Sequence, residues 1–127
     1  MTRQTAKWVR KAEDDVIGAR TLAAQKPPLR NAVVFHCQQS AEKYLKAMLQ
    51  ELRIAIPKIH YLESLLNMLL PHDATLKSIR RILRSLTQFA VDYRYPDENA
   101  TTRQMRSALK HAERVRAEVR TRLGLAV

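Results

Sequence analysis

A row of polar side chains runs through residues 35–49, which read FHCQQSAEKYLKAML. Wound as a helix at about 100° per residue, residues 29–52 place one broad apolar stripe on the core side. The stripe consists of Val34, Cys37, Ala41, Leu45, Met48 and Leu52. Four polar residues fall within or along its margin, and these are Gln38, Gln39, Glu42 and Lys46. This polar row is therefore predicted to be half buried, whereas His36 and Lys43 point away from the stripe.

Half-buried polar groups cost free energy unless they are paired. Glu42 therefore needs a cation, and the predicted partner is Arg94, in the polar segment that follows the fourth predicted helix. Three interpretations of the row stay open. It is a polar network that fixes the register of the helices, a ligand pocket lined by the same groups, or ordinary solvated surface.

The sequence contains no other strong catalytic or metal-binding motif. The four histidines, His36, His60, His72 and His111, show no metal-ligand spacing, and the single Cys37 cannot build a thiolate metal site. The sequence contains no P-loop and no GxGxxG motif, so we expect neither a metal nor a cofactor. His60 is expected to orient the start of a short third helix. Asp15 is expected to make an ion pair or hydrogen bond at the edge of the core near Trp8.

Two basic stripes follow helical spacing. One consists of Lys77, Arg80, Arg81 and Arg84, and the other of Arg103, Arg106, Lys110 and Arg114. With 23 Lys and Arg against 12 Asp and Glu, the chain carries a net charge of +11, which favours a polyanionic partner. The residues expected to contact phosphate are Arg80, Arg84, Arg103 and Lys110. Few aromatic residues accompany these stripes, so solvated helix faces are the alternative interpretation.

The prolines divide the chain into helical pieces, because proline is excluded from helix interiors. They are Pro27, Pro28, Pro57, Pro71 and Pro96. The predicted helices cover residues 4–25, 29–53, 61–70, 74–93 and 102–122. Asp73 and Thr101 are predicted N-caps, the latter with Gln104 at capping-box spacing, and Gly124 suits a helix end. The predicted fold is all-α, an up-and-down bundle of four to five helices.

Composition sets the class of protein. The chain has 127 residues, of which 46% are apolar and 28% charged, a mixture typical of one globular domain. No run approaches the roughly 18 apolar residues of a membrane span. The N-terminal stretch has no apolar signal region and one cysteine cannot form an internal disulfide, so we expect a cytoplasmic protein with no membrane contact.

Four segments in order resemble the HEPN domain family, the helical nucleotide-binding domains of higher eukaryotes and prokaryotes. The segment FHCQQSAEKYLKAML is similar to the signature helix of that family. The others are WVRKAEDDVIGA at 8–19, IHYLESLL at 59–66, and FAVDYRYPDE at 89–98, which is similar to the Arg-Tyr-Pro turn of the small prokaryotic branch. The resemblance implies one HEPN-like domain over residues 1–127, often dimeric and often paired with a minimal nucleotidyltransferase in toxin–antitoxin systems.

The resemblance also implies a test for enzymatic activity. Many active HEPN members are metal-independent ribonucleases with an Arg, four to six intervening residues, and a His. If Arg94 corresponds to that arginine, the histidine should lie between Asn99 and Thr101, where there is none. Arg106 and His111 match the spacing, but a regular helix places them about 140° apart. They are weak candidates within one chain, although a dimer interface could combine residues of two chains.

The preferred hypothesis is therefore a nucleotide- or nucleic-acid-associated binding and partner module, with a homodimer and a nucleotidyltransferase as expected partners. Its predicted ligand site is a polar groove between the second helix and the YRYP turn. Gln39, Glu42 and Lys46 line this groove, Arg94 meets phosphate or Glu42, and Tyr95 offers a ring or hydroxyl. The alternatives are a metal-independent endoribonuclease toxin using Arg94, or Arg106 with His111, and a purely structural interaction subunit.

Overall fold

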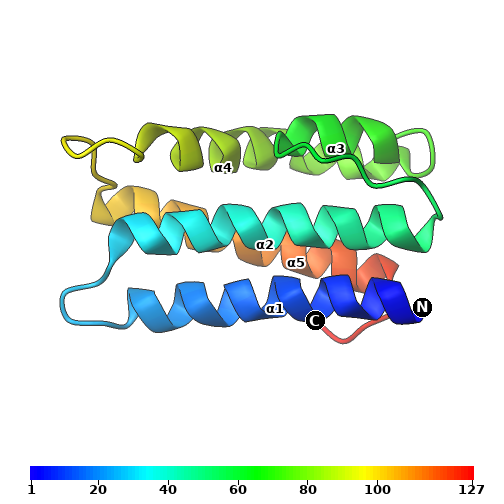
Figure 1. Ribbon diagram of the computed structural model, residues 1–127, viewed down its shortest axis with the longest axis horizontal. Helices are drawn as coiled ribbons and strands as arrows, with labels where there is room; N and C mark the ends of the chain where they lie inside the picture. The colour runs from blue at the N-terminus through cyan, green and yellow to red at the C-terminus, as the bar shows by residue number, and fades with distance from the viewer.

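The computed structural model describes all 127 residues and contains five α-helices and one 3₁₀ helix, with no strand (Figure 1). The elements in chain order are α1 (Arg3–Ala23), α2 (Arg30–Glu51), α3 (Leu62–Leu69), the 3₁₀ helix η1 (Ala74–Ile79), α4 (Arg80–Asp92) and α5 (Thr102–Arg122). The predicted all-α bundle is confirmed. No helix combines the length and the apolar character needed to span a membrane.

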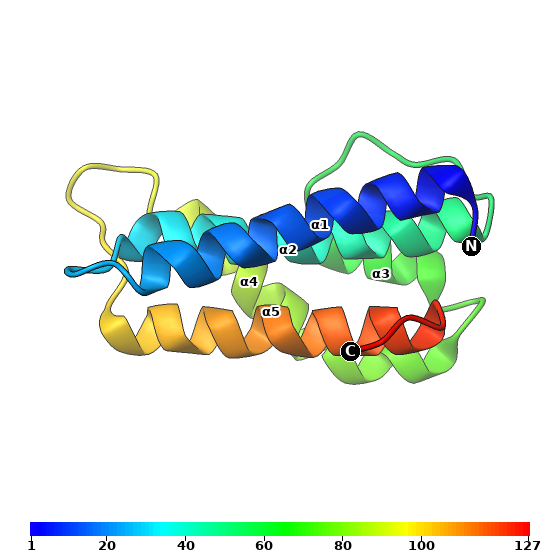
Figure 2. The same cartoon turned by 90° about the horizontal axis from the view of Figure 1, so that it is seen from below.

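Helix α2 is the central element of the bundle. It packs against α1, α3, α4 and α5, and Figure 1 shows it crossing the middle of the molecule with α5 behind it. Seen from below in Figure 2, α1 and α5 lie on the near side and α4 lies behind them. A helix surrounded in this way buries most of its circumference, and 13 of the 22 residues of α2 are buried, polar ones included.

The most extensive interface in the bundle is formed by the antiparallel helices α1 and α2. Small side chains allow two helix backbones to approach closely. Both helices carry such residues in the core, namely Ala12 and Ala19 in α1 and Ser40, Ala41 and Ala47 in α2. The close packing holds Asp15 of α1 against His36 and Lys43 of α2.

A leucine-rich cluster completes the core on the other side of α2. Its fully buried members include Leu62, Leu65, Leu66, Leu69, Leu76, Ile79, Leu83 and Leu86. They come from α3, η1 and α4, so the short helix and the 3₁₀ turn are fixed by burial rather than by their own length. These apolar residues and those of α1, α2 and α5 form one continuous cluster.

The structure differs in one respect from the single helix predicted for residues 74–93. Asp73 is its N-cap, as predicted, and accepts a hydrogen bond from Thr75 N at 3.0 Å. However, Ala74–Ile79 is a 3₁₀ helix, and the α-helix begins only at Arg80. A 3₁₀ helix places residues three apart on the same side, which lets both Leu76 and Ile79 enter the core.

The other terminal signals behave as the sequence indicates. Thr101 and Gln104 form a complete capping box, with Thr101 N donating to Gln104 Oε1 at 2.8 Å and Gln104 N donating to Thr101 Oγ1 at 3.1 Å. Gly124 follows the end of α5 with φ of 75°, a conformation that favours glycine. Leu52 was predicted to lie on the apolar stripe that faces the core, and this was wrong. It is 40% exposed, because α2 ends at Glu51 and the chain turns away.

Candidate functional site

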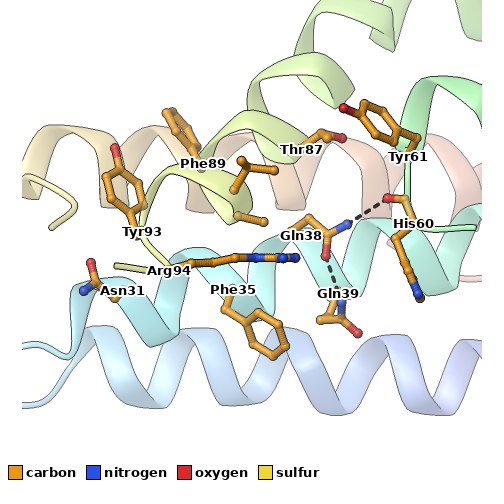
Figure 3. A pocket seen from close by; sticks show the side chains of 12 residues that line it. Asn31, Phe35, Gln38, Gln39, His60, Tyr61, Thr87, Phe89, Tyr93 and Arg94 are labelled. Carbon is orange, nitrogen blue, oxygen red and sulfur yellow. Dashed lines mark hydrogen bonds between the residues drawn. The ribbon is translucent and has the colours of Figure 1, made fainter. Parts of the chain in front are cut away.

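A cavity of about 400 Å³ lies between the first half of α2, the segment before α3, and the end of α4 (Figure 3). Its lining consists of Asn31, Phe35, Gln38, Gln39, His60, Tyr61, Thr87, Phe89, Ala90, Val91, Tyr93 and Arg94. The lining contains aromatic rings, side-chain amides, one arginine and one histidine, but no carboxylate. Such a surface suits a planar ligand that carries negative charge.

The floor of the cavity is a pair of amides from the polar row of α2. Gln38 is buried and donates from Nε2 to the carbonyl of His60 at 3.3 Å. Gln39 donates from Nε2 to Gln38 Oε1 at 2.8 Å, so the two amides are linked (Figure 3). The buried Gln38 is thereby satisfied, and it ties the segment before α3 to the middle of α2.

Arg94 supplies the positive charge of the cavity. It stands two residues beyond the end of α4 and makes no ion pair, and its side chain extends along α2 toward Gln38 (Figure 3). A guanidinium has five donors in a planar fork that matches the geometry of phosphate. Because no carboxylate lines the cavity, these donors are available to an anionic ligand.

The loop that carries Arg94 is anchored at its far end by the start of α2. Arg30 Nε donates to the carbonyl of Ala100 at 2.6 Å. Asn31 accepts from Ala100 N at 2.8 Å and donates to Asn99 Oδ1 at 3.0 Å. These bonds hold residues 99–100 against α2, and they limit the positions that the segment between α4 and α5 can take.

Aromatic side chains from three segments wall the cavity. Phe35 is 52% exposed and Tyr61 is 65% exposed, so both present ring surface to solvent at its mouth. Phe89 and Tyr93 stack on each other at a centroid distance of 6.4 Å. Nucleobases stack well on such rings. The hydroxyl Oγ1 of Thr87, also in the lining, is buried without a hydrogen-bond partner.

Glu42 and Lys46 occupy a different place from the one predicted. They are 5% and 6% exposed, and Lys46 Nζ lies 3.2 Å from Glu42 Oε2. Glu42 Oε1 lies 3.0 Å from His60 Nδ1. The predicted partnership of Glu42 with Arg94 was therefore wrong. A cation one turn away on the same helix is the nearer partner, and neither Glu42 nor Lys46 lines the cavity.

Of the other three predicted groove residues, two line the cavity and one does not. Gln39 and Arg94 line the cavity together. Tyr95 is 72% exposed and lies outside it, in a neighbouring shallow hollow with Asn99, Thr101 and Gln104. The structure thus brings together two of the five predicted groove residues. It adds Gln38, which the sequence placed in the polar row, and Phe35, His60 and Tyr61, which the sequence did not place at the site.

Arg106 and His111 do not converge within one chain. Arg106 is exposed on α5, whereas His111 is half buried and lies 3.4 Å from Ser107 Oγ through its Nε2. Burial, and then the neighbouring charge of Lys110, lower the pKa of His111. The neutral imidazole is thus favoured beside the core.

Only some residues of the two basic stripes are free to bind an anion. Arg80 and Arg84 both bind Glu63, at 3.1 and 2.9 Å, so these two predicted phosphate contacts already have a partner. Arg103, Arg106 and Lys110 are exposed on the first half of α5. Of the predicted contacts, Arg103 and Lys110 are therefore the ones open to an anion.

Two polar clusters join α1 to its neighbours, and only the first was partly foreseen. Asp15 binds His36 Nδ1 at 2.8 Å and also Lys43, so the side chains that point away from the stripe face α1 rather than solvent. Glu13 binds Tyr44, Arg116 and Arg120. Burial and the bond to Glu13 raise the pKa of Tyr44 to about 12. Periodicity alone signals neither cluster.

Metal and thiol chemistry have no support in the geometry. No three His, Cys, Asp or Glu side chains lie close enough together to hold a metal ion. Cys37 is buried, and burial raises the pKa of its thiol to about 12, so the thiolate is strongly disfavoured.

Comparison with known proteins identifies the family. No curated protein and no solved structure is significantly similar to the chain. The model of the HEPN domain family, however, matches residues 5–122, which run from the first turn of α1 to the end of α5 and include the whole lining of the cavity. The chain therefore belongs to the HEPN domain family of helical, nucleic-acid-associated domains.

Proposed function

We propose that this chain is a binding module for nucleotides or for single nucleotides of an RNA chain, and that the cavity between α2 and α4 is its ligand site. The observation that carries the proposal is the unpaired Arg94 in a cavity that has aromatic walls and no carboxylate. The guanidinium receives a phosphate, the base packs against Phe35 or Tyr61, and Gln39 offers hydrogen bonds to a base or sugar. Without a carboxylate to hold Mg²⁺, the ligand binds free of metal.

A calorimetric titration tests this proposal. AMP and UMP are titrated into the protein in EDTA, and the matching nucleosides serve as ligands without phosphate. We expect the monophosphates to bind and the nucleosides to bind about 10-fold or more weakly, because a charged hydrogen bond contributes about 1.5–3 kcal/mol. Absence of heat with millimolar monophosphate, or equal affinity for the nucleosides, contradicts the proposal.

A ribonuclease is the second candidate, and one observation favours it. His60 and Arg94 come from different segments but line the same cavity, and Nδ1 of His60 lies 3.0 Å from the buried carboxylate of Glu42. A carboxylate that orients a histidine is a usual feature of general base sites. In this mechanism His60 takes the proton of a ribose 2′-hydroxyl, the oxygen attacks the adjacent phosphorus, and the leaving 5′-oxygen receives the proton. Arg94 stabilises the charge on the phosphate.

The two candidates separate in one assay of labelled RNA in EDTA. If the chain is a ribonuclease, it releases a 2′,3′-cyclic phosphate, His60→Gln and Arg94→Ala abolish cleavage, and His111→Ala cuts normally. Intact RNA at high protein concentration leaves the binding module as the function. Loss of cleavage in His111→Ala alone would instead place the chemistry on α5.

The expected homodimer is proposed to form on the face that holds the cavity. Phe35, Tyr61 and Val91 are large apolar side chains that are exposed around its mouth. Contiguous exposed apolar groups are a usual mark of an interface. Light scattering is expected to show a dimer for the natural sequence and a monomer for Phe35→Glu with Val91→Glu. A monomeric natural protein contradicts this.

The nucleotidyltransferase stays a prediction that rests on the family resemblance. Copurification of a nucleotidyltransferase with the tagged chain from its native cell would support it. Recovery of the chain alone, at normal expression of its genomic neighbours, would speak against it.

A further inference from the structure

The first half of α1 carries a dense cationic surface on the side of the helix that faces solvent. Between Arg3 and Lys11 the exposed residues are Arg3, Gln4, Lys7, Arg10 and Lys11. Four of these five are cations, and no apolar side chain is among them. At 1.5 Å rise per residue the surface is about 12 Å long, and its four cations fall within an arc of roughly 100°. We call these four residues the α1 cationic surface.

None of the four cations forms an ion pair with an acid of its own helix. Glu13 binds Arg116 and Arg120 of α5, and Asp15 binds His36 and Lys43 of α2. Asp14, the other acid of α1, is exposed one turn after Arg10 on the same face; it makes no ion pair, so one carboxylate stands beside the four cations. The helix therefore uses its paired acids to hold its neighbours and leaves the cations of its first half open to solvent.

Helix stability does not account for this arrangement. The first turn of α1 contains no acidic residue, although acids there would complement the positive end of the helix dipole. Cations at that end are unfavourable, and like charges spaced three or four residues apart, as in Arg3, Lys7 and Lys11, repel each other. A bound anion would relieve both effects.

From this geometry we infer that the α1 cationic surface binds the phosphate backbone of a nucleic-acid strand. A strand in a stacked conformation presents one phosphate per about 3.4 Å of axial rise, so three or four phosphates fit along about 12 Å. An acidic protein partner fits less well, because protein interfaces depend on buried aromatic or apolar anchors and the surface has none. Phosphate contacts need no such anchors, and they are independent of sequence.

This surface is separate from the cavity. No residue of α1 lines the cavity, which α2, α4 and the segment before α3 form. In Figure 2 the beginning of α1 lies on the near side of the bundle and α4 lies behind it. The inference goes beyond the proposed nucleotide site, and either can fail without the other.

The test compares two variants with the same net charge. One changes Arg3, Lys7, Arg10 and Lys11 to Gln. The matched control changes four exposed and unpaired cations elsewhere to Gln, namely Lys26, Arg53, Lys58 and Lys77. Fluorescence anisotropy measures the binding of labelled oligouridylate and oligodeoxythymidylate strands over a range of salt concentrations. Thermal unfolding checks that each variant is folded, and AMP titration checks that its cavity is intact.

We expect the variant of the α1 cationic surface to bind both strands about 10-fold or more weakly at low salt. Its plot of log affinity against log salt should be less steep by about 3, since each phosphate contact with a single strand contributes about 0.7 to the slope. The control should keep a slope close to that of the natural sequence. Equal losses in the two variants would mean that net charge alone is responsible, and would overturn the inference. No strand binding by the natural sequence, or unchanged binding by the α1 variant, would overturn it as well.

Discussion

Glu42 and Lys46 form an ion pair of 3.2 Å inside the bundle, one turn apart on α2, and the same carboxylate also contacts His60 Nδ1. Lys46 Nζ lies 5.9 Å from the ring centroid of Trp8, within the range of a cation–π contact. The Glu42–Lys46 pair thus connects α2 with α1 through Trp8 and with the segment before α3 through His60. The Glu42 and Lys46 part of the polar row is therefore a structural network. Through His60 it supports one wall of the cavity.

Removal of one partner of this ion pair is expected to cost more than removal of both. Lys46→Met leaves a buried carboxylate without its cation and should lower the free energy of unfolding by about 3 kcal/mol. The double variant Glu42→Gln, Lys46→Met should recover at least about 1 kcal/mol of that loss. Urea denaturation of the single and double variants measures the coupling. Additive effects of the two substitutions would show that the pair is not coupled.

Arg30 is expected to affect ligand binding without touching the ligand. It does not line the cavity, but its bond to the Ala100 carbonyl anchors the loop that carries Arg94. Arg30→Met should increase amide hydrogen exchange in residues 94–101 and weaken AMP binding a few-fold, while the bundle stays folded. Arg20→Met is the control, because the Arg20 side chain pairs with Glu113 and makes no bond to this loop. Unchanged hydrogen exchange would show that the bonds of Asn31 to Asn99 and Ala100 are enough to hold the loop.

His111 is expected to make stability depend on pH. Burial and Lys110 lower its pKa in the folded state, so the unfolded chain binds the proton more readily. The contribution to stability is present above the unfolded pKa of about 6.5 and is lost as the pH falls through it toward the folded value. His111→Gln should therefore lose less unfolding free energy between pH 7 and pH 5 than the natural sequence. Equal losses in urea titrations at the two pH values would contradict this.

The sequence predicted the helices well because the signals that end helices are local. Prolines mark the connections, and the Thr101 and Gln104 capping box needs only residues three apart. Periodicity placed Gln38, Glu42 and Lys46 within or beside the apolar stripe and predicted them to be half buried, whereas the structure buries them almost completely. These features depend on neighbours along the chain and not on how the helices cross.

The partners of these polar groups could not be predicted in the same way. The cavity joins Phe35, His60 and Arg94 from three segments, and only the packing of α3 and α4 on α2 brings them together. For Glu42 the sequence did contain the answer, because Lys46 stands at the i,i+4 spacing that allows an ion pair on one helix. The prediction of Arg94 as the partner of Glu42 is wrong because this local partner is already within reach.

The most direct test of the central claim is the affinity of Arg94→Ala for AMP and UMP in EDTA, measured beside Arg81→Ala. Arg81 is an exposed arginine of α4 that makes no ion pair and does not line the cavity. The account predicts that Arg94→Ala weakens binding by about 10- to 100-fold, because a charged hydrogen bond to phosphate is lost, and that Arg81→Ala binds like the natural sequence. Equal affinity of Arg94→Ala and Arg81→Ala would contradict it, and would mean that the cavity does not receive the phosphate.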